Sequence, residues 1–257
     1  DDPDELPELS RRLTRRERAV AREVLAQLKG LEEQAPAALE AALAAQDAEA
    51  AVAAVPFEVW GQAFEAPMRE LAEEAFMVGA EHGAEQAGLT IERAGDSRVP
   101  WNVVNPEAVA WARAHAAELI NAHLNPANIE AVRAAVVRAL RAGWGAEKTA
   151  RVVRASIGLT ARQAQAVLAF AERLAAAEAP LAEAAQAVRV ARYAKAQLRL
   201  RSVTIARHEL MTAGNIGQQR LWQLAAQRGV LDTSRLVRRW MVARMGEWPC
   251  ELCEALA

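Results

Sequence analysis

Two cysteines near the end of the sequence, Cys250 and Cys253, have the spacing of half a zinc site. A tetrahedral zinc site needs four ligands, usually two such pairs or one pair with histidines. The sequence holds no second cysteine pair, and the nearest histidine is His208. Three interpretations stay open: a reduced structural pair, a zinc half-site completed outside this chain, or a redox dithiol, for which the expected βαβ context is missing.

A second group that could do chemistry is Arg207-His208-Glu209, because a histidine beside a carboxylate can act in acid–base catalysis. No partnered nucleophile, glycine-rich phosphate loop or carboxylate cluster accompanies it, so we predict no enzymatic activity. Arg207 and Glu209 are two residues apart and cannot pair on one helix. We therefore expect each to pair with another helix or to cap the loop that holds Trp240.

The third group is a set of cations whose chemistry is charge alone. Residues 1–100 hold 21 acids and 10 bases, a net charge of −11, whereas residues 189–257 hold 5 acids and 12 bases, a net charge of +7. The twelve bases are Arg189, Arg192, Lys195, Arg199, Arg201, Arg207, Arg220, Arg228, Arg235, Arg238, Arg239 and Arg244.

Three of these cations, Arg192, Lys195 and Arg199, recur at the three- and four-residue spacing that places side chains on one helical face. Such a face can bind double-stranded DNA through its phosphates, without sequence preference. The alternative is a face that pairs with acidic residues of this chain or of a protein partner.

Helices must position all of these residues, because strong helix formers dominate the composition and strand-type runs are nearly absent. We predict an all-α protein, an elongated multi-helix bundle with a short irregular C-terminal Trp/Cys segment. Capping boxes at Thr14 and Thr160 predict helices over about 14–34 and 160–178. A short helix is expected at about 146–156, and no apolar run is long enough to span a membrane.

The region around Arg207 is predicted to be a helix that ends before a turn at Gly229. A preceding helix is expected from Pro180 to about Leu200 and to connect to it. Gly214 and Gly217 should leave a shallow groove in the helix around Arg207 for a close neighbour. We also expect Trp222 and Trp240 to pack together against this helix and to close the loop between them. We divide the chain into an acidic N-terminal helical region (1–100), a central helical region (101–180) and a basic C-terminal region (181–257).

An ordered motif runs through the C-terminal region, made of Ile205, Ala206, Arg207, Glu209, Ala213, Asn215, Gly217, Trp222, Trp240, Cys250, Cys253 and Leu256. With this motif, the region resembles the phage head morphogenesis proteins, the Mu F-like minor capsid family. His208 stands where that family usually has Thr, and the sequence ends before a His-Pro-x-Cys segment that members often carry. The turn over residues 157–163 is also similar, so the resemblance covers about residues 101–257.

The resemblance implies a minor capsid protein inside the phage head that associates with the portal and with capsid or scaffold protein. It implies a role in procapsid assembly and in genome packaging or ejection, with the host cytoplasm as the site of assembly. The alternative is the N-terminal part of a phage-associated toxin or enzyme whose catalytic domain lies beyond Ala257.

Overall fold

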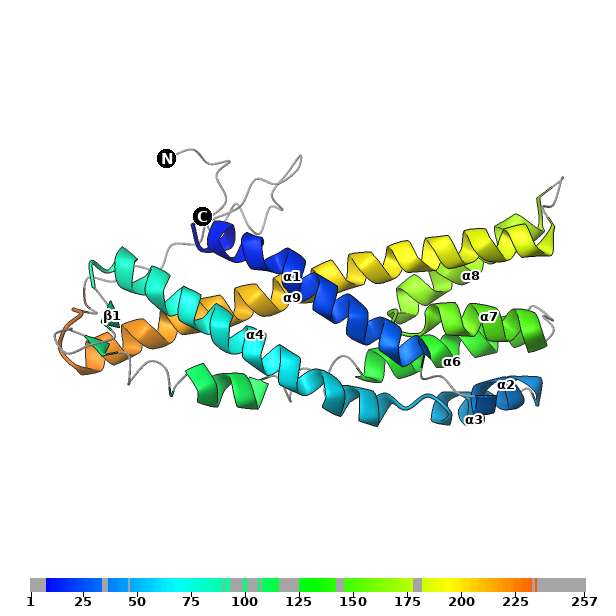
Figure 1. Ribbon diagram of the computed structural model, residues 1–257, viewed down its shortest axis with the longest axis horizontal. Helices are drawn as coiled ribbons and strands as arrows, with labels where there is room; N and C mark the ends of the chain where they lie inside the picture. Colours follow the sequence, from blue (N-terminus) through cyan, green and yellow to red (C-terminus); the bar gives the residue numbers. More distant parts are fainter. Residues whose placement is uncertain are drawn as a thin grey trace. The chain divides into compact units, whose positions relative to one another are not determined.

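The computed structural model describes residues 8–33, 37–45, 47–89, 91–92, 99–100, 106, 108–115, 125–141, 146–177, 182–232 and 234 (Figure 1). These residues form an all-α fold, as predicted. Two two-residue strands, β1 (Ile91–Glu92) and β2 (Val99–Pro100), pair in parallel. The named helices are α1 (Glu8–Glu33), α2 (Ala37–Ala44), α3 (Ala48–Ala53), α4 (Phe57–Gln86), α6 (Asn125–Arg141), α7 (Ala146–Ser156), α8 (Ala161–Ala175) and α9 (Glu183–Gln227).

The chain forms two compact units, and each draws on separate stretches of sequence. The first unit takes its residues from 1–16, 72–112 and 209–257, and the second takes them from 17–71 and 113–208. The boundary falls inside α1, α4 and α9, so each of these helices contributes to both units. The division into three contiguous regions is based on composition and is not tested by these units, so it stays a prediction.

The core of the first unit is formed by α4 and the second half of α9. Phe76 and Leu221 are fully buried there among alanines, and the ring of Trp111 lies 5.9 Å from that of Phe76. Small side chains let the two helices approach closely, so that glycines of α4 and α9 contact the backbone of the facing helix.

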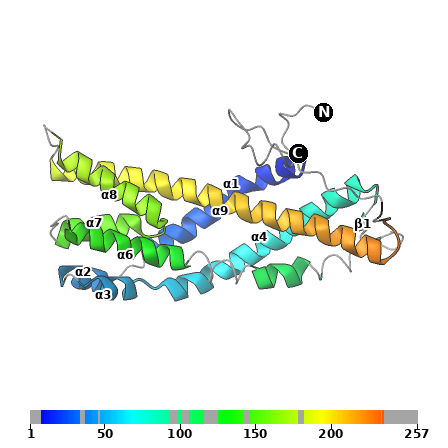
Figure 2. The same cartoon turned by 180° about the vertical axis from the view of Figure 1, so that it is seen from behind.

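The core of the second unit is formed by α6, α7 and α8, which pack on one another and beside the first half of α9 (Figure 2). Val136, Val153 and Leu168 are fully buried. The rings of Phe170 on α8 and Tyr193 on α9 stack at 4.8 Å. In addition, α2 packs on α7, and α3 packs on α6.

Most of the predicted local signals are confirmed. Thr160 closes a capping box with Gln163 at the start of α8, and α7 has the predicted bounds. Gly229 adopts a positive φ of 68° in the turn after α9. The prediction at Thr14 is wrong, because α1 already begins at Glu8. The Thr14 hydroxyl donates instead to the Ser10 carbonyl one turn earlier, at 2.7 Å.

The helix that follows Thr160 ends at Ala175, three residues before the predicted end. The helix expected from Pro180 connects to the helix around Arg207, and together they form the single 45-residue helix α9. The sequence around Leu200 contains no glycine or proline, so nothing there breaks the backbone hydrogen bonds of α9.

Candidate functional site

The three predicted cations on α9, Arg192, Lys195 and Arg199, are all exposed. The opposite face of this half of the helix is buried through Val190, Ala194 and Leu198, which recur every four residues. We call Arg192, Lys195 and Arg199 the basic stripe. Packing of the apolar face fixes the rotation of the helix about its own axis. The basic stripe is therefore held toward solvent.

The basic stripe makes no ion pair with any carboxylate of the described residues. Elsewhere in the second unit, arginines are paired within the chain: Arg138 bonds Glu172 at 2.7 Å, and Arg133 bonds Glu49 at 3.0 Å. In both pairs, the hydrogen bond from the guanidinium lowers the pKa of the carboxyl. Guanidinium groups such as those of Arg192 and Arg199 can bind phosphate through two hydrogen bonds at once.

Arg201 belongs to the same run of bases but is buried, with 5% of its surface exposed. Its Nη1 donates to the Asn128 side-chain oxygen at 2.5 Å and to the Gly158 carbonyl. Burial lowers its pKa to about 10. Arg201 is therefore not part of the exposed basic surface: it joins the first turn of α6 to the turn between α7 and α8.

Arg207 lies on an exposed part of α9 and binds Glu17 of α1 through two hydrogen bonds of 2.8 and 3.0 Å. The hydrogen bond to Glu17 raises the pKa of Arg207. The prediction that Arg207 pairs with another helix is confirmed. The same pairing leaves less of its charge for an outside phosphate.

Glu209 is buried, with only 4% of its surface exposed, and this burial raises its pKa to about 7. The neighbouring His208 is exposed. Because α9 turns by about 100° at each residue, adjacent side chains diverge, and these two do not form one site. Glu209 contributes to the interior of the first unit, and the partner predicted for it on another helix or loop stays a prediction.

Two further motif residues, Gly217 and Trp222, face α4, while Asn215 is exposed. A Cβ atom at Gly217 would overlap the Phe76 backbone carbonyl, so the predicted close neighbour of this glycine is confirmed. The Trp222 Nε1–H donates to the Gly83 carbonyl at 2.9 Å. The motif thus packs one helix backbone against another.

The sequence interpretation missed the glycines on α4 that complete this contact. A Cβ atom at Gly79 would overlap the Gly214 carbonyl, and one at Gly83 would lie 2.9 Å from the Gln218 side chain. Their spacing of four residues, Gly79 to Gly83, is the signal that could have identified them, because it places two small residues on one face.

Trp240, Cys250 and Cys253 lie outside the described residues. The packing of Trp222 on Trp240 and the zinc half-site at the two cysteines therefore stay predictions. Within the described part of the chain, no three His, Cys, Asp or Glu side chains gather as they would around a metal ion.

No protein family, curated protein or solved structure matched the chain. Among the described helices, none is both long and apolar enough to cross a bilayer.

Two features of α9 bear on function. The first half of the helix carries the exposed basic stripe, and the second half makes the glycine-packed contact with α4.

Proposed function

We propose that this chain is a phage minor capsid protein of the Mu F-like class. It would lie inside the head, associate with the portal and with capsid or scaffold protein, and aid procapsid assembly and genome packaging or ejection. The observation that carries the proposal is the ordered motif around Arg207, Gly217 and Trp222, whose residues pack and pair between helices.

Double-stranded DNA is the second partner in this proposal, and the basic stripe is its contact surface. Arg192, Lys195 and Arg199 are exposed, and no described carboxylate pairs with them. Three cations on one helical face attract the phosphate backbone whatever its sequence. A protein inside a packed head meets DNA at high concentration, so even weak binding of this kind would be populated.

Co-expression with the portal, capsid and scaffold proteins of the same phage tests the assembly role. We expect the chain to be retained in purified procapsids in a constant ratio to the portal, and to be lost when the portal is omitted. Particles that assemble normally without retaining the chain would reject this function.

A gel shift with random-sequence duplex DNA at several salt concentrations tests the DNA contact. Neutralising about five phosphates gives a log–log salt slope near −4 to −5, and changing the three stripe residues to Gln should flatten it by roughly two to three units. The matched control changes Arg141, Arg162 and Arg173, three other exposed arginines of the second unit, to Gln. If both triple variants flatten the slope equally, the stripe is not the contact surface.

A further inference from the structure

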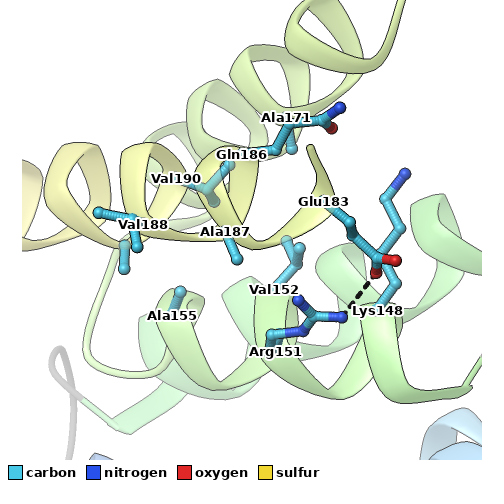
Figure 3. A pocket seen from close by; sticks show the side chains of 11 residues that line it. Lys148, Arg151, Val152, Ala155, Ala171, Glu183, Gln186, Ala187, Val188 and Val190 are labelled. Carbon is cyan, nitrogen blue, oxygen red and sulfur yellow. Dashed lines mark hydrogen bonds and ion pairs between the residues drawn. The ribbon is translucent and has the colours of Figure 1, made fainter. Parts of the chain in front are cut away.

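A cavity of about 300 Å³ lies between α7, α8 and the first two turns of α9 (Figure 3). Most of its wall is aliphatic, from side chains that include Val152, Ala171, Ala187 and Val190. This size is at the lower end of the range in which protein pockets hold a small ligand or an anchoring side chain. The cavity lies wholly within the second unit.

The two ends of the cavity differ in character (Figure 3). At one end stand Lys148 and Arg151, and the Arg151 Nη2 donates to Glu183 at 2.7 Å. At the other end stands Val188, 69% of whose surface is exposed. An apolar group that binds in the cavity could also cover the exposed side chain of Val188.

The charge around this cavity is positive. Its lining residues include two cations, Lys148 and Arg151, against one carboxylate, Glu183. Arg192, the first residue of the basic stripe, follows Val188 by one helical turn and is exposed. An occupant that combines an aliphatic group with carboxylates therefore complements the site in both shape and charge.

We propose that the cavity binds one aliphatic side chain from an acidic helical segment of a protein partner. Carboxylates one turn to either side of that residue would lie near Lys148 and Arg192. Duplex DNA cannot fill such a cavity, because its outer surface is phosphate and sugar and its one exposed alkyl group is the thymine methyl. The inference rests on the proposed function and deepens it, because it gives the protein partner a site beside the DNA-binding stripe.

Methyl NMR on the purified chain tests the proposal with a synthetic alanine-based helix of about 16 residues. The peptide carries one central leucine and glutamates three and four residues to either side. We expect the methyl signals of Val152, Val188 and Val190 to shift and saturate with a Kd of about 0.1–1 mM. Replacing the leucine by alanine, or the glutamates by lysine, should weaken binding at least about tenfold.

A matched pair of protein variants locates the site. Ala191 and Ala196 are both exposed on α9, but only Ala191 lines the cavity. Ala191→Leu should weaken peptide binding at least about tenfold, whereas Ala196→Leu should leave it within about twofold of the unaltered chain. Equal effects of the two variants would overturn the proposal.

The peptides also give results that do not depend on the fold of any variant. The proposal is overturned if no methyl shifts up to several millimolar peptide, or if the lysine peptide binds as well as the glutamate peptide. It is also overturned if random duplex DNA shifts the methyls of Val152 and Val190 as strongly as the peptide does, because DNA offers no aliphatic side chain to fill the cavity. These outcomes are independent of retention in procapsids, so this proposal and the proposed function can fail separately.

Discussion

The two halves of α9 are one continuous helix but use opposite kinds of packing. Residues 183–208 bury one face through Val190, Ala194 and Leu198 and leave the other face exposed. Residues 209–227 bring their backbone against α4: a Cβ atom at Gly217 would overlap the Phe76 carbonyl, and a Cβ atom at Gly79 would overlap the Gly214 carbonyl. The exposed face of the first half therefore tolerates substitutions, whereas contact between backbones restricts substitutions in the second half.

This difference separates the residues available for binding from those that maintain the fold. A partner can bind the exposed face of the first half without disturbing the packing of the core. The motif residues of the second half support helix packing, so changes there should act on stability first and on function only through it. Four predictions test this comparison.

The largest effect is expected from Gly217→Ala, because the new Cβ atom would overlap the Phe76 carbonyl. Ala favours the helix by about 1 kcal/mol relative to Gly, but forcing the two helices apart costs more. We expect a net loss of about 3 kcal/mol in the free energy of unfolding, measured in urea. The control Asn215→Ala, at an exposed position two residues away, should change it by less than about 0.5 kcal/mol.

A smaller loss is expected from Arg201→Ala in the first half of α9. It leaves the Asn128 oxygen and the Gly158 carbonyl without their donor, and an unsatisfied buried acceptor costs about 1–3 kcal/mol. Removing a buried charge offsets part of this cost, so we expect a net loss of about 2 kcal/mol in urea unfolding. Arg199→Ala, at an exposed position, is the control. An equal loss from both would contradict the buried role of Arg201.

Glu209→Gln tests the second half through its pH dependence. The pKa of this carboxyl in the folded chain, about 7, lies above its ordinary value of 4.5. The folded state therefore holds the proton more tightly, and the favourable contribution is complete below pH 4.5 and is lost as the pH rises through 7. Gln stays neutral, so the variant should gain about 1–2 kcal/mol over the unaltered chain at pH 8 and nothing at pH 4.

The measurement for Glu209→Gln is the difference in unfolding free energy between the two proteins across pH 4–8. Taking the difference removes the contributions of the exposed carboxylates, which both proteins share. A difference that does not vary with pH would show that Glu209 is already ionised at pH 5.

The smallest effect on stability is expected when Arg192, Lys195 and Arg199 are changed together to Gln. These side chains are exposed and pair with no described carboxylate, so the unfolding free energy should move by less than about 0.5 kcal/mol. Duplex DNA binding should weaken strongly in the same variant. A loss of stability comparable to that of Arg201→Ala would remove the distinction between the two faces of this half.

Features that depend on neighbours within a few residues could be predicted from the sequence. The capping box at Thr160, the bounds of α7 and the common face of Arg192, Lys195 and Arg199 all follow from side chains one turn apart. The role of Gly217 as a site of close approach was also visible, because a glycine within a helix is unfavourable unless a neighbour needs the space.

In contrast, which of several similar residues is buried, and which element covers it, depends on the tertiary packing. Arg199 and Arg201 are two residues apart in the same basic run, yet one is exposed and the other bonds to Asn128, more than seventy residues away. Thr14 and Thr160 share one sequence pattern, yet only Thr160 begins a helix. Helical periodicity sets the angle of each side chain, but the element that covers that angle comes from distant parts of the chain, and local sequence carries no record of it.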